Sequence, residues 1–229
     1  MIVFVAGMMR SGSTFSFNVV RELLSSRGSV YADACNSIAE VVEQSQSADH
    51  VIVKSHDGDT ESLKLVSNGT IPAICTWRKP VDAIASWIDT FGFDYEQSLA
   101  SYRAWHGMFI EIKDKSLLLS YEDIEHKRTD CVRRIADHIL RDVTDAEVTS
   151  ISSKFSKANA KAVADRVSAG GPDVVDIGFS QHDRVTFLHR RHVSSLEGKP
   201  AEERIPLAMI ARIQRDFADI LDEAGNLAF

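Results

Sequence analysis

A glycine-bounded loop near the amino terminus has the spacing of a phosphate-binding loop. Four residues separate Gly7 from Gly12, and Ser13 and Thr14 follow the second glycine. Glycines allow the tight turn, and the backbone N–H groups of such a loop converge on an anion at the start of the next helix. A simpler alternative is a turn in which Ser11 or Ser13 caps the helix. The order of apolar run, loop and helix favours phosphate binding.

The positive charge of this loop lies in an unusual place. Nucleotide hydrolases with this spacing carry a lysine directly after the second glycine, and that lysine reaches the outer phosphates of ATP or GTP. Here that position is Ser13, and the charge lies three residues earlier, at Arg10. A guanidinium can donate two parallel hydrogen bonds to paired oxygens. The loop therefore predicts an anion site that lacks the lysine used in γ-phosphate transfer.

A second group of reactive side chains follows the apolar run at residues 51–53. Lys54 and His56 come next, with one serine between them. An imidazole titrates near neutral pH and can take a proton from a hydroxyl, while a lysine can neutralise charge on a leaving oxygen. A lone histidine is more often a surface or core residue. Its place after a buried strand favours a catalytic role, because parallel sheets form their sites at the carboxyl ends of strands.

Two further strand ends carry groups that suit a nucleotide. Arg78 follows another apolar run, and Ser86 lies eight residues later, on the same side of the helix predicted to begin at residue 80. Arginine and a hydroxyl suit a dianionic phosphate, but both also occur in turns and on helix surfaces without a ligand. Tyr121 follows the run at 116–120. Its ring could contact a base, or it could simply precede an acid-capped helix.

Together these segments resemble those of sulfotransferases that use 3′-phosphoadenosine 5′-phosphosulfate (PAPS). Residues 10–14 (RSGST) resemble the family's 5′-phosphosulfate loop, and residues 54–56 (KSH) look like its Lys-x-His element. Residues 78–86 resemble its 3′-phosphate motif, R-x-P-x-D-x-x-x-S, and residues 117–124 resemble its strand ending in Tyr-Glu-Asp. The resemblance covers residues 1 to about 125 at the level of motifs.

The resemblance implies sulfuryl transfer from PAPS to an acceptor hydroxyl, or less often an amine, leaving 3′,5′-adenosine bisphosphate (PAP). It implies that His56 is the general base, with Asp57 as the alternative candidate, and that Lys54 stabilises the leaving group. Arg10 would support the sulfuryl end, and no metal is required. The residues implied to hold the co-substrate in this part of the chain are Arg10, Ser11, Gly12, Ser13, Thr14, Arg78, Ser86 and Tyr121.

The last third of the chain departs from the family's pattern. The family closes over the 3′-phosphate with an Arg-Lys-Gly segment, whose nearest counterpart here contains Arg190 and Arg191. Either arginine could clamp the nucleotide, or the pair could be surface charge. His189 and His192 have no third ligand at a suitable spacing, so we expect no metal site. Residues 156–200 are the expected variable acceptor and lid region.

The elements that must position these residues alternate between strands and helices. Apolar runs predict strands at residues 2–6, 29–32, 51–54, 72–77 and 116–120. Periodic segments predict helices at 13–27, 38–46, 80–90, 95–113, 122–141, 145–167 and 206–223, with a loop from 169 to about 179. This alternation predicts an α/β fold of the three-layer P-loop type, with a central parallel sheet of about five strands flanked by helices. We expect one sulfotransferase-like domain over residues 1–229.

Composition limits the partners. The 229 residues carry 26 Lys and Arg against 33 Asp and Glu, a formal net charge of −7. That balance argues against nucleic-acid or membrane-surface binding. Three cysteines lie far apart, which suggests reduced thiols and a cytoplasmic protein. We see neither a signal peptide nor a membrane span, and the oligomeric state is not readable.

Two competing functions share this fold. A P-loop kinase acting on a small molecule should have a lysine at position 13 and an acidic residue ending a core strand to hold magnesium. Position 13 is Ser13, and the strand at 51–53 ends in Lys54. A non-catalytic nucleotide-binding protein is the other alternative, and the presence of Lys54 and His56 argues against it only by resemblance.

Overall fold

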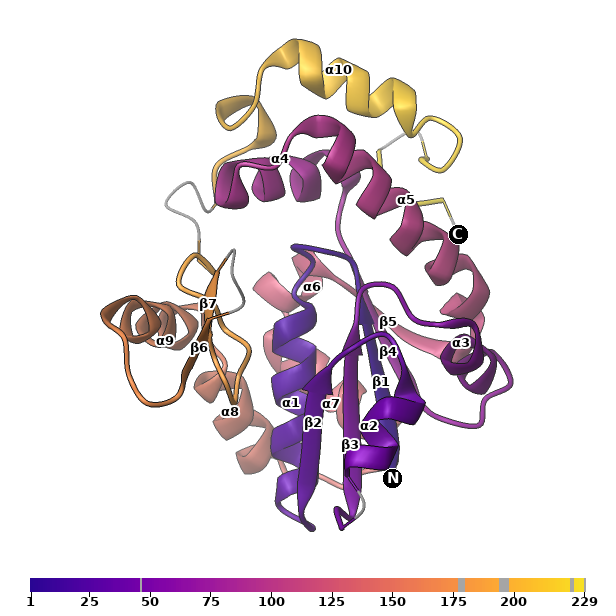
Figure 1. Cartoon of the computed structure of the whole chain (residues 1–229), viewed down its shortest axis with the longest axis vertical. Coiled ribbons are helices and arrows are strands. Elements are labelled where there is room, and N and C mark those ends of the chain that lie inside the picture. Colours follow the sequence, from indigo (N-terminus) through magenta and orange to yellow (C-terminus); the bar gives the residue numbers. More distant parts are fainter. Residues whose placement is uncertain (46, 177–179, 194–197, 223–224, 229) are drawn as a thin grey trace. The chain divides into compact units, whose positions relative to one another are not determined.

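The computed structural model describes residues 1–45, 47–176, 180–193, 198–222 and 225–228. Five parallel strands form its central sheet in the order β2-β3-β1-β4-β5 (Figure 1). The strands are β1 (Ile2–Gly7), β2 (Val30–Ala34), β3 (His50–Ser55), β4 (Ala73–Trp77) and β5 (Ser116–Ser120). Helices flank the sheet, so the predicted α/β fold is confirmed.

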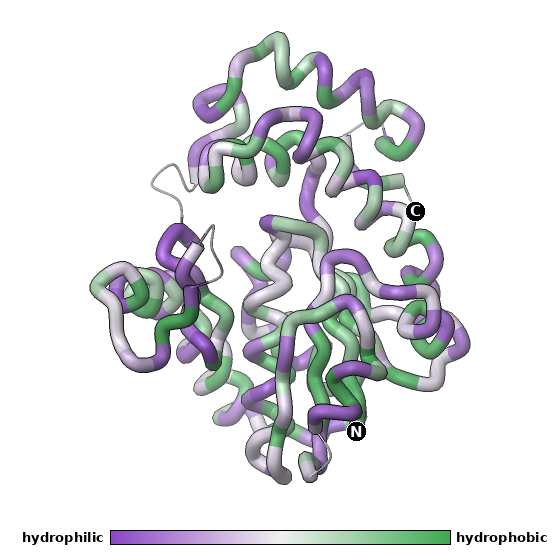
Figure 2. Tube along the Cα trace, in the orientation of Figure 1, coloured by the Kyte–Doolittle hydropathy of each residue, from purple (hydrophilic) through white to green (hydrophobic). Residues whose placement is uncertain are grey.

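The inner strands are apolar because both of their faces are covered. Residues 3–6 of β1, 51–53 of β3 and 73–75 of β4 are buried without interruption, as expected for strands inside a parallel sheet. They appear as the most apolar part of the trace in Figure 2. The register aligns Val5 with Lys54 and Gly7 with Thr76. The carboxyl ends of β3 and β4 therefore lie on either side of the end of β1.

Helices α1 to α5 lie between the strands of the central sheet in the chain, and α6 to α10 follow its last strand, β5 (Figure 1). Their bounds are α1 (Ser13–Ser25), α2 (Ile38–Gln44), α3 (Thr60–Ser67), α4 (Pro80–Phe91), α5 (Tyr95–Ile112), α6 (Tyr121–His126), α7 (Arg128–His138), α8 (Asp145–Lys154), α9 (Lys157–Ala169) and α10 (Leu207–Asp216). Two short 3₁₀ turns, Lys113–Lys115 and Ala201–Glu203, precede β5 and α10.

Contacts divide the chain into two compact units. The first contains Met1–Trp77 and Arg103–Ser156, and with them the whole five-stranded sheet. The second contains Arg78–Tyr102 and Lys157–Phe229. Each unit has its own fully buried large side chains, such as Trp105 and Phe109 in the first and Tyr102 and Phe217 in the second. The expectation of a single domain over residues 1–229, with a variable region at 156–200, stays a prediction.

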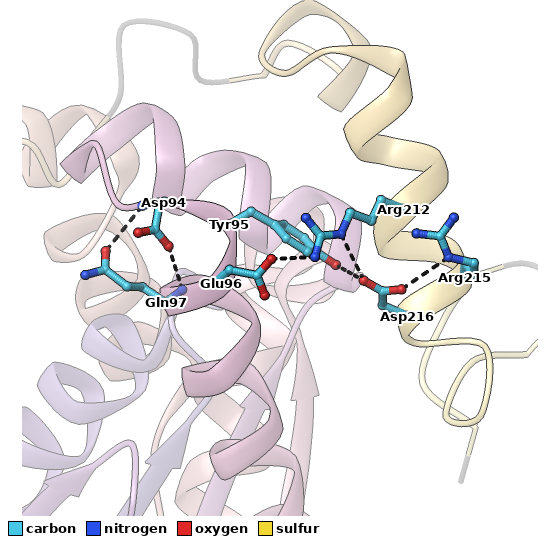
Figure 3. A network of polar contacts seen from close by, with 7 residues as sticks. All are labelled: Asp94, Tyr95, Glu96, Gln97, Arg212, Arg215 and Asp216. Atoms are coloured by element: carbon cyan, nitrogen blue, oxygen red, sulfur yellow. Dashed lines mark hydrogen bonds and ion pairs between the residues drawn. The ribbon is translucent and has the colours of Figure 1, made fainter.

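A polar network in the second unit fastens α10 to the start of α5 (Figure 3). The Tyr95 hydroxyl donates to the Asp216 carboxylate at 2.9 Å. Arg212 donates to Asp216 and to Glu96, and its guanidinium lies 4.3 Å from the centroid of the Tyr95 ring. Burial and the hydrogen bond to Asp216 raise the pKa of Tyr95 to about 12, so this phenol stays protonated near neutral pH.

Three helix predictions were wrong in detail. Residues 60–67, which we assigned to no element, form α3, whose amino terminus is capped by Asp59 accepting a hydrogen bond from the Ser62 N–H at 2.7 Å. The predicted helix at 122–141 is two helices, α6 and α7, because Lys127 leaves the helical conformation between them. The predicted helix at 145–167 is also two helices, α8 and α9, because Phe155 leaves the helical conformation after α8. These differences depend on local helix ends and not on the apolar pattern.

The carboxyl-terminal third also differs from expectation. Where we predicted a loop to about residue 179, β6 (Val174–Asp176) pairs antiparallel with β7 (Gln181–Asp183); residues 177–179 lie outside the described part. The last helix ends at Asp216 instead of near residue 223. Residue 223 also lies outside the described part of the chain. Asp216 and Asp219 give a physical reason, because carboxylates at the carboxyl end of a helix oppose its dipole.

Candidate active site

The loop between β1 and α1 requires both of its glycines. A β-carbon on Gly7 would lie 2.1 Å from the β-carbon of Ser13, so no side chain fits there. Gly12 has φ +90° and is the N-cap of α1, and a β-carbon on it would lie 2.8 Å from Cδ1 of Ile124. The helix therefore begins after Gly12, and neither Ser11 nor Ser13 is its N-cap.

The start of α1 has the chemistry that an anion site needs. Because the N-cap is a glycine, no side chain caps the helix, and the N–H groups of its first turn point out along the axis. Ser13 and Thr14 occupy that turn, and both are buried. Arg10 precedes them with φ +63°, a left-handed conformation that is uncommon for a side chain other than glycine. The residues present fit a 5′-phosphate group.

The Ser11 hydroxyl points into the protein. It lies 2.6 Å from the Met8 carbonyl oxygen and 2.6 Å from the Thr76 hydroxyl, and it is fully buried. Any contact of Ser11 with a ligand would therefore come from its backbone. Thr76 was not among the residues that we selected from the sequence. The only signal for it was a hydroxyl in an otherwise apolar strand, two residues before Arg78.

Lys54 and His56 come together at the end of β3, beside the loop. The His56 Nδ1 contacts the carbonyl oxygen of Gly7. A carbonyl can only accept, so Nδ1 carries the proton and Nε2 keeps a free electron pair. The Lys54 Nζ lies 3.4 Å from that Nε2. Asp57 is exposed and follows His56.

These two side chains have strongly lowered pKa values. Burial, and then the charge of Lys54, lower the pKa of His56 to about 3 against an opposing effect of the Gly7 carbonyl. Burial lowers the pKa of Lys54 to about 8. At neutral pH the imidazole is therefore neutral and the ammonium is charged. A neutral base next to a cation is the pairing that proton abstraction and leaving-group stabilisation need.

Tyr121 also lies next to the loop. It is the first residue of α6, directly after β5, and its Cδ2 lies 3.8 Å from the point where a β-carbon of Gly12 would be. The half-buried ring thus borders the start of α1. The first unit thereby brings together the loop, Lys54, His56 and Tyr121.

The remaining predicted residues belong to the second unit. Arg78 follows β4 directly, and Ser86 is fully buried in α4. Arg191 donates from its guanidinium to the carbonyl oxygen of Thr90 at 3.1 Å, one turn beyond Ser86 on the same helix. Arg190 is exposed, and its backbone N–H donates to Gln181. Arg191 is thus held against the helix that carries Ser86.

The described residues contain no group of three or more His, Cys, Asp or Glu side chains placed to hold a metal ion. Within the same residues, no helix has the length and apolar character needed to cross a membrane.

The chain resembles known proteins in structure and not in sequence. No family model matches the chain, and no curated protein does. The mouse sulfotransferase SULT7A1, solved with PAP, is 15% identical with a TM-score of 0.67, and the match covers 97% of this chain and 86% of that one. Retinol dehydratase with androsterone and inactive cofactor PAP is 14% identical with a TM-score of 0.61, covering 95% and 80%. Retinol dehydratase with retinol and PAP is 16% identical with a TM-score of 0.58, again covering 95% and 80%.

The likeness extends over nearly the whole chain, including the last third, where the motifs depart from the family's pattern. At these identities it establishes the fold. The chain therefore has the fold of a mouse sulfotransferase and of retinol dehydratase, both solved with PAP, and the resemblance predicted from its motifs is confirmed at the level of the fold.

Proposed function

We propose that this protein is a PAPS-dependent sulfotransferase. The observation that carries the proposal is the placement of Lys54 and His56 at the end of β3, the sheet neighbour of the strand that leads into the phosphate loop. The fold shared with proteins solved with PAP supports it.

The proposed reaction assigns one role to each of the two side chains. The acceptor oxygen forms a bond to sulfur, and the bond between sulfur and the bridging oxygen of the 5′-phosphate breaks. His56 takes the acceptor proton on Nε2, the nitrogen that the Gly7 carbonyl leaves unprotonated. Lys54 neutralises the electron pair that returns to the bridging oxygen. Atoms and charge balance with PAP and a sulfated acceptor as products.

Each of the predicted binding residues would hold one part of the co-substrate. Gly12, Ser13 and Thr14 would bind the 5′-phosphate, Arg10 the sulfuryl end, and Tyr121 the adenine. Arg78 and Ser86 would bind the 3′-phosphate, with Arg190 or Arg191 closing over it. A 3′-phosphate site of this kind would select PAPS over ATP, because ATP has no group to place there.

For the acceptor we propose a small molecule with a hydroxyl group. Androsterone and retinol occupy the two retinol dehydratase complexes. The net charge of −7 supports such an acceptor over a nucleic acid. We also propose a cytoplasmic location, on the basis of the three separated cysteines.

Thermal unfolding with PAP, compared with ATP plus magnesium, tests the proposal. At ~100 times the dissociation constant a ligand adds about 2.7 kcal/mol of stability, and each kcal/mol raises the Tm by roughly 2–4 °C at this chain length. We expect a clear shift with PAP and little with ATP. Arg10→Ala should reduce the shift, while the exposed Arg27→Ala on α1's carboxyl side should retain it. A shift with ATP and none with PAP would favour the kinase instead.

A further inference from the structure

We infer that Thr76 is a positioning residue, which holds the phosphate loop in its anion-binding shape from the neighbouring strand β4. The inference deepens the proposed function and rests on it. Thr76 is fully buried and lies opposite Gly7 in the sheet register. A β-carbon on Gly7 would be 2.6 Å from the Thr76 Oγ1, so the hydroxyl lies in the space that this glycine leaves open.

Three hydrogen bonds close a ring between β4 and the loop. The Met8 N–H donates to the Thr76 carbonyl at 2.9 Å. The Ser11 hydroxyl donates to the Met8 carbonyl at 2.6 Å, and the Thr76 carbonyl oxygen lies farther from it, at 3.0 Å. Since Ser11 has only one hydroxyl proton, Thr76 is then the donor in the 2.6 Å contact between the two hydroxyls. The ring thus ties both Met8 and Ser11 to one residue of β4.

The residues before Thr76 in strand β4 offer its hydroxyl no side-chain partner. Ala73, Ile74 and Cys75 before it are buried and apolar, as expected inside a parallel sheet. A valine would have the same shape and the same preference for a strand. What threonine adds is a donor for Ser11, in a place where an unsatisfied polar group would be costly.

The ring surrounds the strained part of the loop. Arg10 lies between Met8 and Ser11 and has φ +63°. Such a conformation costs free energy and persists only where the surroundings enforce it. With Met8 and Ser11 fixed, Arg10 and the N–H groups after it keep their direction. Without the Thr76 hydroxyl, Ser11 loses its donor, and we expect the loop to relax away from the shape that an anion needs.

Binding of three nucleotides by Thr76→Val, Thr76→Ser and Ser98→Ala tests the inference. Thr76→Val should weaken PAP and adenosine 5′-phosphate by about tenfold, the order of one hydrogen bond with its partner left unsatisfied. Adenosine 3′-phosphate, which does not use the loop, should bind as before. Thr76→Ser keeps the hydroxyl and should restore affinity. Ser98→Ala removes another buried hydroxyl, bonded to the Asp94 carbonyl, and should leave all three affinities unchanged.

The outcomes separate this inference from the proposed function. If wild-type protein binds PAP and Thr76→Val binds it equally well, Thr76 does not position the loop. If Thr76→Val weakens adenosine 3′-phosphate as much as PAP, or if Thr76→Ser does not restore the affinity, the substitution has damaged the fold in general. Either result would also overturn the inference. If wild-type protein binds inorganic phosphate but not PAP, the proposed function is wrong, and the same variants are compared with phosphate. If it binds neither, both ideas are wrong.

Discussion

The residues at the end of β3 control each other's charge. The Gly7 carbonyl fixes the proton of His56 on Nδ1, and the Lys54 ammonium faces the other nitrogen. In the free protein the imidazole of His56 is therefore neutral but engaged by a cation. An anionic donor would compete for that cation, so proton abstraction would depend on the donor being bound.

The lowered pKa of Lys54, about 8, predicts an alkaline limit on activity. The pH dependence of kcat/KM reports ionisations of the free enzyme. We expect kcat/KM for PAPS to fall above about pH 8, as Lys54 loses its charge. Arginine does not deprotonate in proteins, so Lys54→Arg should lack this fall whatever its absolute rate. The exposed Lys115→Arg should retain it. An unchanged fall in Lys54→Arg would assign the limit to another group.

His56→Ala should abolish transfer and leave PAP affinity unchanged. It should also change the acid stability of the fold. The folded pKa of about 3 lies below the usual 6.5, so between these values the unfolded chain binds a proton that the folded protein does not. Stability therefore falls as the pH drops from 6.5 toward 3. Urea unfolding at pH 7 and pH 5 should show a smaller loss in His56→Ala than in wild-type protein.

The exposed His126→Ala serves as its control and should behave as wild type in both measurements. If His56→Ala lowers transfer and PAP binding to the same extent, His56 has a structural role and is not the base.

At the scale of elements, α10 depends on a buried tyrosine of α5. The Tyr95 side chain is 7% exposed, and its hydroxyl bond to Asp216 spans the two helices. Tyr95→Phe should lower the free energy of unfolding by about 1 kcal/mol, measured in urea. Tyr31→Phe removes a hydrogen bond to Gln44 at the surface and should cost less. Equal costs would show that the network of Figure 3 adds nothing to the docking of α10.

The elements that the sequence predicts well are those whose pattern comes from burial. Strands β1, β3 and β4 are covered on both faces, so they read as unbroken apolar runs. The loop was predicted because its glycine spacing follows from steric need, as Gly7 and Gly12 show. Helix α3 was not predicted, since its start depends on the Asp59 cap more than on an apolar stripe.

The contacts of the site that the sequence did not predict depend on the register between strands, which cannot be read from one sequence. The contact between His56 and Gly7 follows from the pairing of β1 with β3, and that between Ser11 and Thr76 from the pairing of β1 with β4. The place of His56 after a buried strand, together with the family resemblance, gave it its expected role. Neither gave a reason to select Thr76, because a hydroxyl that bonds inside the protein belongs to no motif.

For the whole molecule, the net charge of −7 concerns the surface more than the site. The basic residues Arg10, Lys54 and Arg78 follow or end three adjacent strands, β1, β3 and β4. A few local cations are enough for one small anion, whereas an extended polyanion would need a basic surface. An acidic protein can therefore use an anionic co-substrate.

The strand order has a consequence for biosynthesis. Central strand β1 precedes both of its partners in the chain, and β3 begins only at His50 and β4 at Ala73. During synthesis, the apolar residues 2–6 remain without a strand partner until the segments that form β3 and β4 have left the ribosome. Pairings between segments so distant in the chain form slowly and leave hydrophobic surface exposed in the meantime. The segment of the nascent chain that is thus exposed to aggregation, and to binding by chaperones, is the strand that later leads into the loop before α1.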